Sequence, residues 1–312
     1  MRVRKLLGWG VALAMVGSVA FAWHARWFEL GWYWVSMERA ADEWRDRSVW
    51  LPHYRVTLEA REIVGIEDDA SGLTYSDATD TLFSIINAPP MVAELSLDGE
   101  LLRRIPVRGV RDPEGITHIG GDIFALSDER EHQIYMVRID AQTEEIDVQD
   151  APRLGLGFDR TKNLGIEGLS WDAVEQRLYL VKEKAPLRVL AIDGLPGVLD
   201  GSRFDLQINE WISPRASSLF VRDLSSLTLH EPTGHLLLMS DESALVIEYE
   251  PDGRPISVMP LWKGWHGLHA RVPQAEGLAL GPRGEIYVLS EPNLFYRFER
   301  EVEAHWVRDG AP

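Results

Sequence analysis

Five short motifs place carboxylate or hydroxyl side chains at regular intervals along this chain. Each motif has an acidic residue or a serine, then a small residue, then leucine or isoleucine. The leading residues are Ser71, Glu114, Glu167, Ser225 and Glu276. Three copies also have an aspartate two residues earlier, namely Asp69, Asp112 and Asp223. Alternate residues of a β-strand face the same side, so each aspartate should share a strand face with the motif residue that comes after it.

These side chains suit a hard cation. Carboxylates that converge in a confined space repel one another, so they either hold protons at an unusually high pKa or bind a positive ion. Every available ligand atom is an oxygen and no histidine belongs to the set, which favours Ca²⁺, with Mg²⁺ as the alternative, over Zn²⁺. The predicted metal ligands are Glu114, Glu167, Glu276, Ser71, Ser225, Asp112, Asp223, Asp128 and Asp241.

The same motifs also have a structural interpretation. Glu-Gly and Ser-Gly pairs occur in tight turns whose side chains cap neighbouring backbone amides, and a repeated fold needs such turns whatever its function. At the level of sequence both interpretations stay open. No Gly-x-Ser-x-Gly elbow is present, and we nominate no catalytic residue.

The spacing of the motifs predicts the elements that hold them. The leading residues are 43, 53, 58 and 51 positions apart, close to the roughly 40 to 50 residues of a four-stranded propeller blade. A second strand comes after each motif and ends at a polar residue: Asn87, Asp128, Glu183, Asp241 and Glu291. A third strand comes next. A four-stranded unit repeated five times predicts an all-β, five-bladed β-propeller.

The ends of the chain predict how the ring closes. The strand Tyr54 to Arg61 precedes the first motif and has no blade of its own, so we expect it to complete the fifth blade and remove an open sheet edge. A six-bladed ring is the alternative, because the long interval from residue 167 to 225 could hold another blade. Its Gly-Leu-Pro-Gly stretch and its single strand, Phe204 to Ile208, favour a loop insertion instead.

Propeller geometry adds the second strands to the site. The first strand of each blade lines the central channel and the second runs antiparallel to it, so the start of one and the end of the other share a face. Glu114 and Asp128 are centred on the turn at Gly121, and Ser225 and Asp241 on Thr233. The acidic side chains should therefore converge at one mouth of the channel.

The N-terminus has the pattern of an export signal. Arg2, Arg4 and Lys5 precede an uncharged apolar run from Leu6 to Ala22, which places the rest of the chain on the non-cytoplasmic side. We expect an uncleaved anchor over residues 1–22, a juxtamembrane stalk over 23–52 with a polar helix near 36–46, and the propeller over 53–312. The interfacial aromatics that favour an anchor are Trp23, Trp27, Trp32, Tyr33 and Trp34. Cleavage after Ala20-Phe-Ala22 is the alternative, which would release the propeller into the periplasm.

Composition excludes some partners. The formal net charge of −17 repels nucleic-acid phosphates and favours cations. The chain has no cysteine, which excludes disulfides and thiolate metal sites.

Several motifs in register resemble those of a known family. Ser71-Gly-Leu-Thr-Tyr, Asp112-Pro-Glu-Gly-Ile-Thr, Leu126-Ser-Asp-Glu and Glu276-Gly-Leu, with the N-terminal anchor, are similar to the SdiA-regulated (YjiK-like) bacterial propeller proteins over about residues 54 to 300. The resemblance implies a five-bladed propeller, distantly similar to NHL-repeat proteins, with a calcium site and no established catalytic activity. The fourth motif departs from the pattern, with Ser225-Ser226 in place of Glu-Gly.

Two hypotheses of function arise from these observations. The first is a propeller on the inner membrane that faces the periplasm, binds Ca²⁺, and recognises an unidentified protein or small-molecule ligand as an interaction or sensing module. The second is a metal-dependent hydrolase of the lactonase or phosphoesterase type, in which the cation polarises a carbonyl or phosphoryl oxygen and Asp128 or Asp241 acts as base.

Overall fold

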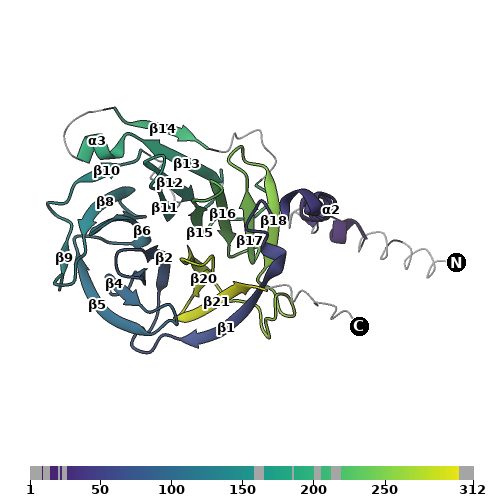
Figure 1. Ribbon diagram of the computed structural model, residues 1–312, viewed down its shortest axis with the longest axis horizontal. Coiled ribbons are helices and arrows are strands. Elements are labelled where there is room, and N and C mark those ends of the chain that lie inside the picture. Colours follow the sequence, from purple (N-terminus) through teal and green to yellow (C-terminus); the bar gives the residue numbers. More distant parts are fainter. Residues whose placement is uncertain are drawn as a thin grey trace, which may run out of the picture.

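The computed structural model describes residues 27–157, 165–184, 186–199, 205–211 and 219–301, together with residues 9, 15–19 and 22. Five sheets in this part of the chain stand as blades around a central channel (Figure 1). The chain is therefore an all-β, five-bladed β-propeller, as predicted, and the six-bladed alternative is wrong.

Each blade begins with a strand at the channel and ends with a strand at the rim (Figure 1). Blade one contains β2 (Ala70–Ser76), β3 (Thr81–Ile86), β4 (Met91–Leu95), β5 (Leu101–Arg108) and β9 (Ile146–Asp147). Blade two contains β6 (Pro113–Gly120), β7 (Ile123–Asp128), β8 (Gln133–Arg138) and β10 (Arg153–Gly155). Blade three contains β11 (Ile166–Asp172), β12 (Arg177–Lys182), β13 (Arg188–Asp193) and β14 (Gln207–Glu210). Blade four contains β15 (Ser226–His230), β16 (His235–Ser240), β17 (Leu245–Tyr249) and β18 (Pro255–Pro260). Blade five contains β19 (Ala275–Leu280), β20 (Ile286–Ser290), β21 (Leu294–Arg300) and β1 (Tyr54–Glu62).

The hydrophobic core is divided among the spaces between blades. Every residue of β16 is buried because other blades pack against both faces of its sheet, whereas β5 at the rim alternates between buried and exposed residues. Between blades one and two, the rings of Phe83 and Phe124 lie 4.7 Å apart within one apolar cluster. The middle strand β16 is therefore largely a run of apolar residues and the rim strand β5 alternates, whereas the rim strand β18 of blade four is buried over most of its length.

The ring closes as the sequence predicts. Strand β1 pairs antiparallel with β21, from Tyr54 opposite Arg300 to Glu62 opposite Leu294, so the two ends of the propeller share blade five. The long interval before the fourth motif holds the short helix α3 (Leu195–Leu199) and β14, which is the fourth strand of blade three.

Hydroxyl side chains join neighbouring blades at one end of the channel. Each first strand carries Thr or Ser three residues after the leading motif residue in blades one to three, and this oxygen accepts a hydrogen bond from a backbone N–H of the next blade. Thr74 accepts from His118 at 3.1 Å, Thr117 from Trp171 at 3.1 Å, and Ser170 from Leu229 at 3.0 Å. These three hydroxyls line a cavity of about 440 Å³, which we call the hydroxyl mouth.

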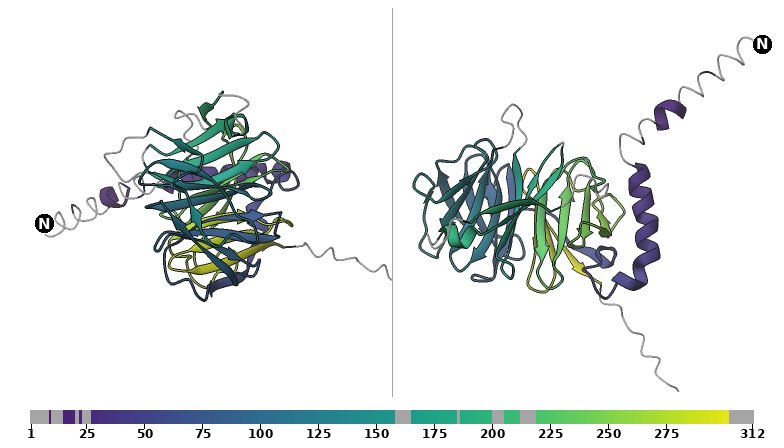
Figure 2. Two further views of the ribbon diagram at one scale, coloured as in Figure 1. Left: turned by 90° about the vertical axis from the view of Figure 1, so that its left-hand side faces the viewer. Right: turned by 90° about the horizontal axis from the view of Figure 1, so that it is seen from above.

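The segment before the propeller packs against blade four. Helix α2 (Trp27–Trp44) starts earlier than the predicted polar helix near 36–46 and lies along the side of the ring (Figure 2). Tyr33 stacks on Phe220 with 4.5 Å between ring centroids, and Met37 of α2 is buried in the same apolar cluster. Two of the aromatics predicted to face the membrane interface, Tyr33 and Trp34, thus contact the propeller instead, while Trp27 and Trp32 are exposed.

A buried carboxylate fixes the connection between α2 and the propeller. Glu248 of β17 is fully buried and accepts hydrogen bonds from the backbone N–H groups of Val49 at 2.8 Å and Trp50 at 3.0 Å. The hydroxyl of Ser257 and Nδ1 of His235 also hydrogen-bond to it, at 2.7 and 2.8 Å. A short 3-10 helix, η1 (Leu51–His53), comes next and leads into β1.

Most of the predicted anchor over residues 1–22, and Trp23, lie outside the described residues. Among the residues described, no helix is both long enough and apolar enough to cross a membrane.

Candidate functional site

Irregular pairing at the start of the first strands sets the direction of the motif side chains. The register of β2 with β3 shifts between Ala70 and Leu73, and equivalent shifts occur at the motifs of β6, β11 and β19. A β-bulge bends a strand and re-aims a side chain, which here turns the leading residue toward the channel mouth. The glycine after it is needed because the next blade comes close: a Cβ on Gly72 would lie 2.5 Å from the carbonyl oxygen of Glu114.

The re-aimed side chains line a cavity of about 950 Å³, which we call the acidic mouth. Nine carboxylates and only two cationic side chains belong to its lining, which consists of Glu114, Glu129, Glu167, Glu183, Lys184, Asp223, Ser225, Asp241, Glu242, Arg271, Pro273, Gln274, Glu276 and Glu291. The excess of negative charge makes this end of the channel attractive to cations.

The first carboxylate cluster joins blades one and two. Ligand atoms of Asp112, Glu114 and Glu129 all lie within 4.8 Å of one another. The hydroxyl of Ser71 donates a hydrogen bond to Oε2 of Glu114 at 2.5 Å. The amide of Asn87 donates to Oδ1 of Asp112 at 2.7 Å and to Oε1 of Glu114 at 2.8 Å, so blade one holds both carboxylates in place.

The second cluster shares a residue with the first. Ligand atoms of Glu129, Glu167 and Glu183 also lie within 4.8 Å of one another. The N–H of Gly165 donates to Glu129 at 3.0 Å, and Nζ of Lys184 lies 2.6 Å from Glu183. Within the described part of the chain, the carboxylate of Glu167 has no hydrogen-bond donor. Glu129 is therefore the link between two groups of oxygen ligands.

The opposite wall of the acidic mouth comes from blades four and five. The carboxylate of Asp223 accepts hydrogen bonds from the Ser240 hydroxyl and from the N–H of Glu242 at 3.2 Å. Oδ1 of Asp241 accepts from the N–H of Ala275 at 3.2 Å. The hydroxyl of Ser225 is buried and has no hydrogen-bond partner among the described residues, although buried polar groups are normally satisfied.

Crowding of carboxylates raises their pKa values. Burial and the charges of Asp112 and Glu129 raise the pKa of Glu114 to about 8, against the lowering effect of the Ser71 hydrogen bond. Burial, then the nearby Asp241, raise the pKa of Glu276 to about 9. Burial raises the pKa of Glu167 well above its ordinary value, and Glu114 adds to the effect. Without a cation, some of these carboxylates would therefore be protonated, and so uncharged, near neutral pH.

The structure brings most of the sequence-predicted site residues together. Glu114, Glu167 and Glu276 line one cavity with three further predicted residues, Ser225, Asp223 and Asp241. Ser71 and Asp112 lie beside them, through their contacts with Glu114 and Asn87. Asp69 belongs to a third group with Asp68 and Glu291, and Glu291 of this group also lines the acidic mouth.

Asp128 is placed differently. Its side chain is fully buried and accepts hydrogen bonds from the N–H groups of Arg111 at 2.8 Å and Glu131 at 3.1 Å, which stabilises the loop after β7. Asp128 is not in the lining of the acidic mouth. The next residue, Glu129, projects into the cavity instead, because side-chain direction alternates at the end of a strand.

Glu129 and Glu183 are the important residues missing from the predicted ligands. Both come directly after a second strand, in Ser127-Asp-Glu129 and Lys182-Glu183. The only sequence signal is that position, and a shift of one residue decides whether the side chain enters the channel. Sequence spacing alone does not resolve that shift.

A family model described as SdiA-regulated matches residues 46–299, which is the propeller except for the last residue of β21. The chain belongs to the SdiA-regulated family.

The SdiA-regulated propeller is also similar to three solved structures. A chain in a nidogen/laminin complex is 16% identical with a TM-score of 0.47, covering 72% of this chain and 73% of that one. A luciferin-regenerating enzyme is 15% identical with a TM-score of 0.47, covering 77% and 94%. A streptogramin B lyase is 9% identical with a TM-score of 0.48, covering 80% and 98%.

Proposed function

We propose that this protein is a membrane-anchored periplasmic propeller that binds Ca²⁺ at the acidic mouth and serves as an interaction or sensing module. The observation that carries the proposal is the pair of carboxylate clusters that share Glu129. Ca²⁺ takes oxygen ligands at about 2.3–2.6 Å, so one ion can contact three ligand atoms that lie within 4.8 Å of one another.

The chemistry of the lining supports a cation rather than a structural turn. A turn-capping carboxylate accepts N–H groups, as Asp128 does, but Glu167 and Glu276 accept no hydrogen bond among the described residues. The buried, unpartnered hydroxyl of Ser225 also faces this cavity. A set of unsatisfied oxygens on an irregular wall favours Ca²⁺ over Mg²⁺, because Mg²⁺ demands near-octahedral geometry and Ca²⁺ accepts six to eight oxygens flexibly.

Calorimetric titration of the purified protein with Ca²⁺ tests the proposal. We expect saturable binding that Glu129→Gln weakens at least about tenfold, because this residue belongs to both clusters. The matched control is Glu175→Gln, an exposed glutamate at the far hairpin turn, which should bind like the wild type. Absence of Ca²⁺ binding, or equal affinity in both variants, would contradict the proposal.

A hydrolase is the second candidate, favoured by the size of the cavity. About 950 Å³ is far more than one ion fills, and Lys184 and Arg271 in the lining could hold an anionic substrate group. Of the two bases suggested by the sequence, buried Asp128 lies outside the cavity and Asp241 lines it. Turnover of lactone or phosphoester panels with Ca²⁺, Mg²⁺ or Mn²⁺ that disappears in both Asp241→Asn and Glu167→Gln would favour the enzyme. No turnover with any metal would favour the binding module.

The proposed location is supported by the N-terminal sequence and by α2. Basic residues precede the apolar run over Leu6–Ala22, and α2 then exposes Trp27, Phe28 and Trp32 beside the propeller. Protease added to spheroplasts should digest the propeller of the full chain, while deletion of residues 1–22 should prevent export. A mature N-terminus at Trp23 would show that the signal is cleaved, and a protected propeller would overturn the periplasmic location.

A further inference from the structure

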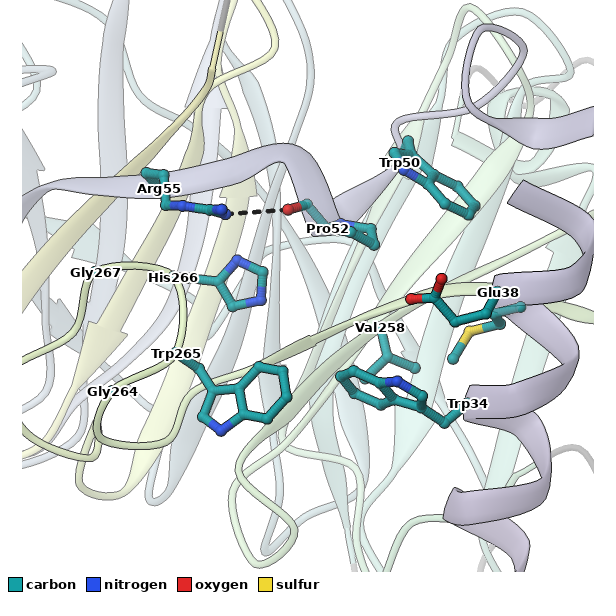
Figure 3. A pocket seen from close by; sticks show the side chains of 11 residues that line it. Trp34, Glu38, Trp50, Pro52, Arg55, Val258, Gly264, Trp265, His266 and Gly267 are labelled. Atoms are coloured by element: carbon teal, nitrogen blue, oxygen red, sulfur yellow. Dashed lines mark hydrogen bonds between the residues drawn. The ribbon is translucent and has the colours of Figure 1, made fainter. Parts of the chain in front are cut away.

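A second cavity lies between α2 and the propeller, away from the channel (Figure 3). Its volume is about 350 Å³. The side chains that define its chemistry are Trp34, Glu38, Trp50, Arg55, Trp265 and His266. They come from α2, from the connection to β1, from the start of β1 and from the loop before β19, so the cavity exists only because α2 is fixed against blade four.

Three indole rings border the cavity. Trp34 of α2 and Trp265 of the loop meet edge to face, with 5.1 Å between ring centroids and 76° between planes. Trp50 is 4% exposed, whereas Trp265 is 42% exposed and forms the open side. The face of an indole carries a negative potential, and rings arranged around one space attract organic cations.

The charged groups of the cavity leave one negative charge unpaired. The carboxylate of Glu38 points away from α2 into the cavity in Figure 3, and it makes no ion pair or hydrogen bond within the described part of the chain. Arg55 is occupied: Nη1 donates to the carbonyl oxygens of Pro52 at 3.0 Å and Tyr54 at 2.8 Å, and Nε lies 3.2 Å from Glu301.

The histidine on the wall adds no positive charge. Nδ1 of His266 donates to the carbonyl oxygen of Tyr54 at 2.8 Å, which leaves Nε2 as an acceptor in the neutral ring. Burial lowers the pKa of His266, which favours the neutral form. The cavity therefore combines three indoles and a free carboxylate, and its one cationic side chain is already neutralised.

We propose that this cavity binds an organic cation, a quaternary or alkylated ammonium group, with the indoles of Trp34, Trp50 and Trp265 around its methyl groups and Glu38 as its counter-ion. The same chemistry occurs in a free solute such as choline and in the choline headgroup of a lipid. The site shares no residue with the acidic mouth, so the proposal can be tested independently of Ca²⁺ binding.

Titration of the full chain in non-ionic detergent with tetramethylammonium and choline tests the proposal. We expect saturable binding by calorimetry, and an upfield shift of the N-methyl proton resonance on binding, because ring currents shield protons over an indole face. Trp265→Leu and Glu38→Gln should each weaken binding at least about tenfold. Both side chains are partly or largely exposed, so neither substitution should prevent folding.

Two matched controls separate this site from general attraction to an acidic protein. Glu43→Gln removes an exposed carboxylate from the same helix, and Trp27→Leu removes an exposed indole, both outside the cavity. Both variants should bind like the wild type. The proposal is overturned if the neutral isostere of choline, with carbon in place of nitrogen, binds as tightly as choline, or if Trp265→Leu and Glu38→Gln keep wild-type affinity.

Reconstitution in nanodiscs distinguishes the two sources of the cation. If the ligand is a lipid headgroup, tetramethylammonium should bind more weakly in phosphatidylcholine discs than in phosphatidylglycerol discs. Equal affinity in both discs assigns the site to a free solute, and no binding in either disc overturns the site.

Discussion

The two mouths of the channel are built from the same first strands and yet use their polar side chains in opposite ways. At the hydroxyl mouth, each of Thr74, Thr117 and Ser170 accepts a backbone N–H from the next blade. At the acidic mouth, Glu167 and Glu276 accept no N–H among the described residues, and the Ser225 hydroxyl has no partner there. In blades one to three, the leading motif residue and the hydroxyl residue are three positions apart along the chain.

The difference shows that one repeat contains two kinds of polar side chain: hydroxyls that stabilise the fold, and carboxylates that are suited to binding a ligand. A polar group that is satisfied by the next blade contributes to stability, because a buried N–H without an acceptor costs free energy. Carboxylates that are buried close to one another destabilise the fold, as the raised pKa values of Glu114 and Glu276 indicate. Such an arrangement persists when a ligand offsets its cost.

The largest expected effect is the removal of metal from the acidic mouth. Binding at a thousandfold excess over Kd stabilises the native state by about 4 kcal/mol, which corresponds to a fall of roughly 8 °C in Tm on chelation. Calorimetric melting with Ca²⁺ and with a chelator measures the difference. An unchanged Tm, in a protein that contains no metal by elemental analysis, would contradict metal binding at the acidic mouth.

The second effect is a pH dependence that Ca²⁺ should reverse. The native pKa values of Glu114 and Glu276, about 8 and about 9, lie above the ordinary value of 4.5, so the metal-free native state binds more protons than the unfolded state. The contribution of these two groups to stability is therefore fully present below about pH 4.5 and is lost as the pH rises through 8 and 9. Protons compete with Ca²⁺ for the carboxylates, so the stabilisation by Ca²⁺ should increase over the same range.

Urea unfolding midpoints at pH 5, 7 and 9, with and without Ca²⁺, measure this reversal. Other groups also titrate in this range, so the control is Glu114→Gln with Glu276→Gln, which should flatten the fall in the metal-free protein. A slope that is identical in this double variant would show that the acidic mouth does not cause it.

The third effect concerns the hydroxyl mouth. Thr117→Val keeps the shape of the side chain but leaves the N–H of Trp171 without its acceptor, which should cost about 1–3 kcal/mol in the free energy of unfolding. The loss should be equal with and without Ca²⁺, since we place the ion at the other end of the channel. Thr79→Val, at an exposed turn, is the control and should change little. A loss that depends on Ca²⁺ would mean that the two mouths are coupled.

The smallest expected effect is a gain in stability, whereas the effects above are losses. Glu276→Gln removes one charge from the acidic mouth, so it should stabilise the metal-free protein by about 1 kcal/mol while it weakens Ca²⁺ binding. Chemical denaturation in chelator measures the gain, and Glu175→Gln should show none. A destabilised metal-free variant would indicate that Glu276 has a structural role like that of Thr117.

The sequence by itself determined the repeat and the type of ligand. Residues at fixed positions after each turn are local properties of the chain, so the five motifs predicted five blades, and the unpaired strand at Tyr54 predicted how the ring closes. The apolar runs of the middle strands also result from burial between blades. The chemistry of the predicted site, oxygen ligands without histidine, was equally visible, since it depends only on residue types.

Tertiary structure decided which of those oxygens meet. Asp128 and Glu129 are neighbours in the chain, yet one caps a loop and the other joins two clusters, because the last residues of a strand turn to opposite sides and the next blade supplies the N–H of Gly165. The docking of α2 is likewise a long-range event: Glu248 of blade four binds the N–H groups of Val49 and Trp50, almost two hundred residues away. A local sequence pattern does not specify contacts between segments so far apart, and the tryptophan-lined cavity therefore becomes visible only in the folded molecule.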